Sequence, residues 1–384
     1  KICSRRKSIS PFGFSSPRIL SSENLKQERS EMRNSGCFRE VISMFAEGLG
    51  KKIVKIATEK SRNGGGSWCF TPLMAAASSA IAERIPLADL VLEVRDARIP
   101  MSSECHLLKI HPPSICRRIT VLNKMDLADQ DQLKKLIRYL DAQGFTCCAV
   151  NSHNKVSIKQ LLNLIQARAK RKERGVGSTI TVMIVGIPNV GKSALANSLH
   201  LIGRISAAEK GKMKHATVSP HPGETQDICS YKIASHPNIY VLDTPGILPS
   251  EILNFALCSN LLLTGAVRDS YIAAKELATY FLVILSLSDE YKKWERFRGR
   301  NGDHCTDHTQ DSVVHCVRGA LFDAISCFEG DLQNKEEVEK LVGILFSIFK
   351  DILSEGCDTN SCKKVADKVL NLYRTGRLGS YTLE

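Results

Sequence analysis

One octapeptide limits what this 384-residue chain can fold into more than any other feature. Residues 186–193 read GIPNVGKS, the pattern G-x-x-x-x-G-K-S, between the strand-like segment STITVMIV and the helix-forming segment ALANSL. Its two glycines let the backbone wrap around a phosphate group, and the NH groups at the start of the following helix point at that group. We therefore expect an α/β fold of the P-loop NTPase class, with a mostly parallel sheet and flanking helices.

The side chains of this loop have different expected roles. Lys192 is long enough to reach the β- and γ-phosphate oxygens of a nucleotide, and the Ser193 hydroxyl suits Mg²⁺. The loop residues that we expect to contact the nucleotide are Gly186, Asn189, Val190, Gly191, Lys192, Ser193 and Ala194. The alternative interpretation is a glycine-rich turn without a ligand.

A second motif, N-K-x-D, indicates which base is bound. The strand pattern RRITVL delivers Asn123, Lys124 and Asp126 to its carboxyl end, where open α/β sheets bind ligands. A carboxylate can accept from the two neighbouring NH groups of guanine, an Asn amide can face O6 and N7, and a Lys stem can lie over the ring. The alternative is a surface turn after a strand. A third strand pattern, FTCCAV, ends at Asn151 and Ser152, and we expect this loop to close over the same base.

Two further segments are expected to surround the γ-phosphate. A polar, basic stretch after the P-loop offers Thr225 as the hydroxyl best placed to complete the Mg²⁺ shell. The strand pattern NIYVLD then ends in D-x-x-G, with Asp243 as outer-sphere Mg²⁺ partner and the Gly246 amide as sensor of the γ-phosphate. Lys192, Gly246 and Thr225 are accordingly the residues that we expect to act in catalysis.

Composition and charge bound the remaining functions. The chain has 53 Lys and Arg against 40 Asp and Glu, but the surplus is largest in residues 1–65 and the body is only mildly basic. No stretch approaches about 18 consecutive apolar residues, so we expect no integral membrane association, and we expect no DNA partner. Fourteen cysteines without a C-x-x-C pair favour free thiols in a reducing compartment.

Three segments are expected along the chain. Residues 1–66 are interpreted as a transit peptide or a disordered basic leader, because residues 1–22 are rich in Ser, Lys and Arg and contain no acid. A second interpretation starts the targeting helix at Met44, because apolar residues recur at helical spacing after it. A third interpretation is a disordered basic tail that has no targeting function. Residues 67–250 are expected to form the nucleotide-binding G domain, and the apolar periodicity of residues 251–384 predicts a helical domain.

The order of the motifs is unusual for a GTPase. N-K-x-D stands about sixty residues before the P-loop, whereas ordinary small GTPases place it after D-x-x-G, so the motifs are circularly permuted. This order, with Asp96-Ala97-Arg98, GIPNVGKS, PGET, DTPGI and TGAVRD, resembles the YlqF/YawG-type permuted GTPases that assist ribosome assembly. The resemblance extends over about residues 44–384 and is strongest to the plant mitochondrial DAR GTPases of the short integuments class.

The resemblance implies a function, ligands and partners. It implies GTP binding and hydrolysis coupled to maturation of the large ribosomal subunit, with GTP, GDP and Mg²⁺ as ligands. The implied partners are the mitochondrial large-subunit precursor and its rRNA, and the implied location is the mitochondrion, with the chloroplast as the alternative. Asn189 matches the position that binds K⁺ in similar GTPases, although holding the loop in shape is an alternative role for it.

Two residues depart from what fast hydrolysis requires. Ile247 follows D-x-x-G and cannot orient a water molecule as a Gln would. Leu73, in the segment FTPLM, stands where the resemblance places a His. We therefore expect slow intrinsic hydrolysis, and the alternative function is a non-hydrolysing, GTP-dependent module that binds ribosomes or RNA.

One helical segment interleaves aromatic and basic side chains. Trp294, Arg296 and Phe297 occur together, followed by two more arginines. Such a set can stack on rRNA, but it is also typical of the end of a packed helix.

Overall fold

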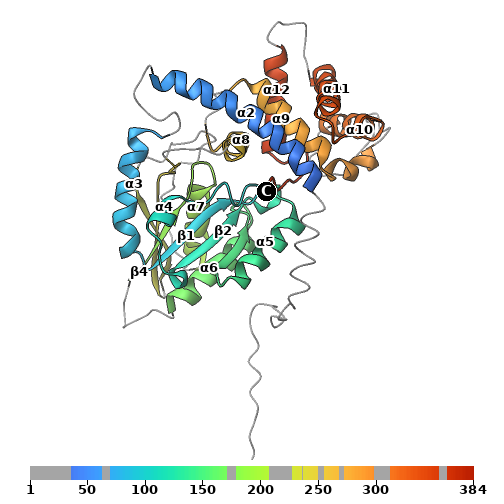
Figure 1. The fold of residues 1–384 in the computed structure, drawn as a ribbon. Coiled ribbons are helices and arrows are strands. Elements are labelled where there is room, and N and C mark those ends of the chain that lie inside the picture. The colour runs from blue at the N-terminus through green and yellow to red at the C-terminus, as the bar shows by residue number, and fades with distance from the viewer. Residues whose placement is uncertain are drawn as a thin grey trace, which may run out of the picture.

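The computed structural model describes most of the chain as a parallel sheet overlaid by a layer of helices (Figure 1). The described residues are 36–62, 70–170, 179–206, 227–235, 237–249, 255–267, 272–297, 312–353 and 361–384. In the view of Figure 1 the sheet occupies the lower half, and helices from both ends of the chain lie above it.

Six strands form one sheet in the order β3-β2-β1-β4-β6-β5. They are β1 (Leu90–Asp96), β2 (Arg118–Asn123), β3 (Thr146–Val150), β4 (Thr179–Val185), β5 (Cys229–Ser235) and β6 (Asn238–Asp243). All neighbours pair in parallel except β5 and β6, which are antiparallel. Apolar runs in the sequence predict all five parallel strands, including the run at residues 90–94 that becomes β1. Their carboxyl ends lie along one edge of the sheet, where ligands of such sheets bind. The antiparallel edge strand β5 is an addition that the sequence analysis missed.

The apolar runs of the central strands are buried because helices cover both faces of the sheet. Every residue of β1 is buried, including the charged Glu93 in its middle. The Glu93 carboxylate accepts hydrogen bonds from Arg95 at 2.9 Å and from Arg118 at 2.6 Å. A buried charge is tolerated only when it is paired in this way, so the ion pairs explain how a polar residue fits into a central strand.

The helices belong to two groups. Those around the sheet are α3 (Pro72–Arg84), α4 (Leu107–Ile110), α5 (Gln130–Ala142), α6 (Lys155–Lys170) and α7 (Lys192–Ser206), with short 3₁₀ turns at Ile85–Leu87, Ile115–Arg117 and Met125–Leu127. Those of the second layer are α2 (Gly36–Arg62), α8 (Phe255–Leu263), α9 (Ala274–Leu287), α10 (Ser312–Ser326), α11 (Lys335–Leu353) and α12 (Ser361–Arg374), with a 3₁₀ segment at Glu290–Phe297. The apolar periodicity after residue 251 predicts helices in residues 273–285, 313–328, 336–349 and 362–376, and these four are present as α9 to α12.

Helix α9 is the centre of the second layer. Its residues from Leu277 to Leu287 are almost all buried, because α2, α11 and α12 surround it. The Phe281 ring lies 4.5 Å from the Tyr373 ring of α12 and 5.6 Å from the Tyr381 ring near the end of the chain. The chain end is thereby packed into the core of the helical layer.

Helix α2 corrects one expectation about the first 66 residues. A disordered leader does not describe residues 36–62, which form a helix with Val41, Leu49 and Ile53 buried in the core that also contains residues of α8 and α9. The Ser259 hydroxyl of α8 also donates to the Ala46 carbonyl at 3.1 Å. The apolar spacing after Met44 predicts this helix, but its partner is the second layer of the fold. Residues 1–35 and 63–69 lie outside the described part.

Two compositional expectations concern membranes and cysteines. Within the described ranges no helix combines the length and apolar character that crossing a bilayer requires. The nine cysteines whose side chains the structure describes are free thiols.

Candidate functional site

The P-loop lies between β4 and α7, at the carboxyl edge of the sheet. Gly191 has a φ of 92°, a backbone conformation that favours glycine. A Cβ atom at this position would lie 2.3 Å from the Asn123 amide nitrogen, so the loop can approach the neighbouring motif only through a glycine. The Lys192 ammonium donates to the Ile187 carbonyl at 2.8 Å and thus lies across the mouth of its own loop.

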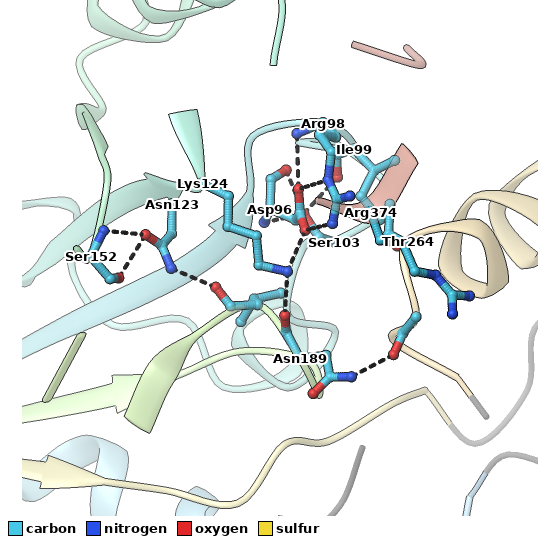
Figure 2. Close-up of polar contacts among 12 residues, drawn as sticks. Asp96, Arg98, Ile99, Ser103, Asn123, Lys124, Ser152, Asn189, Thr264 and Arg374 are labelled. Atoms are coloured by element: carbon cyan, nitrogen blue, oxygen red, sulfur yellow. Dashed lines mark hydrogen bonds and ion pairs between the residues drawn. The ribbon is translucent and has the colours of Figure 1, made fainter. Parts of the chain in front are cut away.

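The N-K-x-D motif and the P-loop are joined directly. The Asn123 amide donates to the Val190 carbonyl at 2.8 Å, and the Lys124 ammonium donates to the Asn189 carbonyl at 2.6 Å. Figure 2 shows both contacts from the end of β2 to the loop after β4. Two motifs more than sixty residues apart in the chain therefore form one site, as a single nucleotide requires.

The loop after β3 completes the support of Asn123. The Ser152 backbone NH and hydroxyl both donate to the Asn123 side-chain oxygen, at 3.2 Å and 2.8 Å. The Ser152 carbonyl in turn accepts from the Ser198 hydroxyl of α7 at 2.7 Å. Asn151 stands beside them, with its side-chain oxygen accepting from the His153 NH at 2.8 Å. These contacts fix the orientation of the Asn123 amide, and closure of the loop over a base stays a prediction.

Asp126 stands at the outer side of the same site. It belongs to the 3₁₀ turn Met125–Leu127 that follows Lys124, whose φ of 60° reverses the chain at the end of β2. The Asp126 side chain is exposed, while its backbone carbonyl accepts from the Ser380 hydroxyl at 3.3 Å. An exposed carboxylate on an anchored turn suits the reading of a base edge that enters from solvent.

Ser193 and Asp243 form the candidate Mg²⁺ position. The Ser193 hydroxyl donates to Asp243 Oδ2 at 2.7 Å. Asp243 Oδ1 is buried and has no hydrogen-bond partner within the described residues, an arrangement that a hydrated cation would satisfy. Serine and carboxylate oxygens are ligands that Mg²⁺ prefers, so the two residues fit this ion. Thr225, the third expected Mg²⁺ residue, lies outside the described part of the chain.

Burial changes the proton affinities of the two charged groups beside the phosphates. It lowers the pKa of Lys192 to about 8, although Asp243 opposes the shift. Burial also raises the pKa of Asp243, although the Ser193 hydroxyl and Lys192 oppose it. Each group is thus less stable in its charged form than it is in water, and each would regain that stability beside a bound phosphate and its cation.

The D-x-x-G segment packs directly on the P-loop. A Cβ atom on Gly246 would lie 2.6 Å from the backbone of Pro188, so only glycine permits this approach. The Ile247 NH donates to the Gly186 carbonyl at 3.3 Å, and the Ile247 side chain is buried. The Gly246 amide is therefore close to the P-loop, and Ile247 contributes packing in place of a water-orienting amide.

Asp96 is a member of the site that sequence reasoning missed. Its carboxylate accepts from Lys124 at 2.9 Å, from Arg98 Nη2 at 2.8 Å and from Arg98 Nε at 3.0 Å, as Figure 2 shows. Burial alone would raise the pKa of Asp96, but Arg98 and Lys124 together hold it well below its usual range. The position of Asp96 at the end of a buried strand beside the N-K-x-D strand was the available signal.

Asn189 connects the P-loop to the helical layer. Its side-chain nitrogen donates to the Gly265 carbonyl at 2.7 Å, in the turn after α8. Its φ of 58° is unusual for a residue other than glycine and turns the side chain out of the loop. Holding the loop is thus a visible role of Asn189, and K⁺ coordination stays a prediction.

The structure also describes Leu73 and the aromatic pair Trp294 and Phe297, which lie outside the P-loop and the N-K-x-D motif. Leu73 lies in the first turn of α3 with 67% of its surface exposed, and the nearby Phe70 packs against the hydrophobic cluster that contains Ile247. Trp294 and Phe297 are each 4% exposed, so stacking of these two rings on rRNA is wrong and the packed helix end is confirmed.

Comparison with known proteins gives consistent matches. A family model described as "50S ribosome-binding GTPase" matches residues 181–317. "DAR GTPase 2, mitochondrial" of Arabidopsis thaliana is 48% identical over 362 residues, covering 88% of this chain and 95% of that protein. "Short integuments 2, mitochondrial" of the same organism is 37% identical over 342 residues, covering 82% and 88%. "Ribosome biogenesis GTPase A" of Priestia megaterium is 28% identical over 325 residues, covering 82% and 95%.

Proposed function

We propose a role for this chain from the premise that it belongs to the circularly permuted ribosome-assembly GTPases, the family of the mitochondrial DAR GTPases. The chain is a guanine-nucleotide-binding GTPase. Our proposal is that it acts as a GTP-hydrolysing switch that assists assembly of the mitochondrial large ribosomal subunit.

The observation that carries the proposal is the pair of hydrogen bonds between the guanine motif and the P-loop. Asn123 and Lys124 reach the carbonyls of Val190 and Asn189 at 2.8 Å and 2.6 Å. A base at Asp126 and phosphates at the P-loop then belong to one ligand. The sheet keeps this site even though its base-reading part precedes its phosphate-binding part in the chain.

Each site residue has a proposed task in GTP binding. Asp126 accepts the guanine N1 and N2 hydrogens, and the stem of Lys124 lies over the ring. Lys192 and the amides of residues 187–194 hold the phosphates, and the Gly246 amide contacts the γ-phosphate when it is present. Ser193, Asp243 and Thr225 would hold Mg²⁺, which neutralises phosphate charge when it is bound.

The residues indicate how hydrolysis is limited. Ile247 is buried and carries no polar group, so it cannot orient the attacking water. We propose that intrinsic turnover is slow and that K⁺ near Asn189 supplies part of the missing charge stabilisation. Asn189 also carries an amide carbonyl oxygen, which is the kind of ligand that K⁺ takes.

The names of the relatives support the partner and the place. One relative is named as a ribosome biogenesis GTPase, and two others are named as mitochondrial. We therefore propose the mitochondrion as the location and the large-subunit precursor with its rRNA as the partner. The chloroplast alternative receives no support from these names.

Gradient sedimentation of the full chain with mitochondrial large-subunit precursors tests the proposal. With a non-hydrolysable GTP analogue the chain should move with the precursor, and with GDP it should stay at the top of the gradient. Asp126→Asn is the matched control, because it should lose the response to the GTP analogue and gain one to the corresponding xanthosine analogue. Sedimentation that is the same with both nucleotides would exclude the switch.

Phosphate release by the same protein tests catalysis and its activators. We expect a slow basal rate that rises with K⁺ relative to Na⁺ and rises again with large-subunit precursors. Asn189→Ala should lose the K⁺ response. No K⁺ response in the unaltered chain would remove K⁺ from the proposal, and no stimulation by the precursor would contradict the assembly role.

A further inference from the structure

The last five residues, Ser380–Glu384, pass between two loops of the nucleotide site. We call them the closing segment, and we call residues 123–129 and 96–103 the base loop and the acid-arginine loop. In Figure 1 the C-terminal end of the chain lies between the sheet and the helical layer, above the strands that lead into these loops. The closing segment is therefore placed to act on both loops together.

The closing segment is bonded to the base loop at Asp126 and at two residues that follow it, Leu127 and Asp129. The Ser380 hydroxyl donates to the Asp126 carbonyl at 3.3 Å, and the Tyr381 NH donates to the Leu127 carbonyl at 3.1 Å. The Asp129 NH donates to the Thr382 hydroxyl at 3.2 Å. These contacts hold the turn that carries the base-reading carboxylate.

Its other end is bonded to the acid-arginine loop. The Leu383 NH donates to the Arg98 carbonyl at 2.8 Å. The Glu384 carboxylate accepts from the Met101 NH at 2.7 Å, from the Ser102 NH at 3.0 Å and from the Ser102 hydroxyl. This loop contains Asp96, the partner of Lys124, so both charged residues of the guanine motif depend on loops that the segment holds.

The helical layer fixes the closing segment in turn. The Tyr381 ring packs against Phe281 of α9, and the Ser380 NH donates to the Glu290 carboxylate at 3.1 Å. The Asn260 amide of α8 donates to Glu384 at 3.3 Å. The segment is thus a direct physical connection between the second layer and the base-reading loop.

We propose that Ser380–Glu384 is a positioning element for guanine recognition, which sets the affinity and base selectivity of the site by holding the base loop against the acid-arginine loop. In this proposal the segment acts through the base loop and not through contact with the nucleotide. The inference rests on the proposed contact of Asp126 with the base, since a carboxylate accepts two hydrogen bonds from guanine only when its turn is held in register.

Nucleotide binding by the full chain with single substitutions tests this. The probes are fluorescent GDP and IDP, because inosine lacks the 2-amino group that Asp126 would bind. Glu384→Ala removes the acceptor of the Met101 and Ser102 groups, and Thr382→Val removes the acceptor of Asp129 with little change in shape. We expect each to weaken GDP binding by about three- to tenfold, the range of one or two hydrogen bonds, and to reduce the preference for GDP over IDP.

The controls separate positioning from general destabilisation. Glu329→Ala, at an exposed glutamate in the loop that follows α10, should leave both affinities unchanged. Glu384→Gln keeps one acceptor oxygen and should give an intermediate loss. Equal weakening of GDP and IDP, or unchanged GDP affinity in both Glu384→Ala and Thr382→Val, would overturn the proposal. If the unaltered chain itself did not prefer GDP over IDP, the assignment of Asp126 would fail, which is a result distinguishable from failure of the closing segment.

Discussion

The Lys124 ammonium lies 2.9 Å from the Asp96 carboxylate, at the point where the guanine motif meets the P-loop. The same ammonium reaches the Asn189 carbonyl, so one side chain is held from two loops at once. Its stem is consequently fixed at the place where it would lie over a guanine ring. We therefore propose that the strand that ends at Asp96 supports base recognition through its contact with Lys124.

Asp96→Asn should destabilise the fold as well as the site. Arg98 is 2% exposed and pairs with Asp96 through two nitrogens, so removal of the carboxylate charge leaves a buried guanidinium uncompensated. We expect a loss of about 3 kcal/mol in the free energy of unfolding, measured by urea denaturation. Asp131→Asn, in the exposed ion pair with Lys134, should change it by less than about 0.5 kcal/mol. Similar losses in both variants would show that the buried Asp96 ion pair contributes no more to the free energy of unfolding than an exposed pair does.

Nucleotide affinity should depend on pH through Lys192. Burial lowers the pKa of this group to about 8 in the free protein, and bound phosphate raises it because the anion favours the ammonium. Binding therefore takes up a proton at pH values above 8. GDP affinity should be constant below that pH and fall above it, by at most about tenfold per pH unit.

Calorimetry in two buffers of different ionisation enthalpy measures this proton uptake at pH 8.5. Lys192→Arg is the matched variant, because a guanidinium stays charged throughout and its binding should take up no proton from this group. Proton uptake that is absent in the unaltered chain, or unchanged in Lys192→Arg, would contradict the role given to Lys192.

Asp126→Asn should change the preferred base. An amide presents a donor where the carboxylate accepts, and xanthine presents an oxygen where guanine carries its amino group. We expect the variant to bind XDP more tightly than GDP, as measured by competition against a fluorescent nucleotide. Asp131→Asn should keep the preference for GDP. A variant that binds both nucleotides as the unaltered chain does would place the base elsewhere.

Leu73→His should raise the rate of hydrolysis. Leu73 is exposed on the first turn of α3, on the side of the fold where Phe70 packs with the cluster containing Ile247. An imidazole there can take a proton from the attacking water near neutral pH, and general-base catalysis is commonly worth about a hundredfold or more, so we expect at least about tenfold. Leu87→His, also at an exposed leucine but before β1 at the opposite edge of the sheet, is the control. An equal increase of the hydrolysis rate in both variants would contradict a specific role for position 73.

The meeting of the two motifs could be predicted from the sequence, but its supporting contacts could not. Parallel strands place their carboxyl ends at one edge, so Asn123 and the P-loop were expected at the same edge of the sheet once their strands were identified. The pairing of Asp96 with Lys124 depends on the order of β1 and β2 within the sheet. The sequence around an aspartate at a strand end does not indicate which basic residue will pair with it.

The helical layer shows the same limit. Periodicity identified α9 to α12, because apolar residues at helical spacing need no knowledge of their partners. It could not show that α2 packs against α8 and α9, since the basic composition of the preceding residues favoured a leader. Nor could it place Glu384 on the backbone of Met101 and Ser102, because that contact joins positions 282 residues or more apart.

A crystal structure of the chain with GDP tests the central claim most directly. We expect one bound nucleotide, with guanine N1 and N2 within hydrogen-bond distance of the Asp126 carboxylate and the β-phosphate beside the Lys192 ammonium. A nucleotide that met the P-loop while its base lay away from Asp126, or that bound elsewhere, would contradict it.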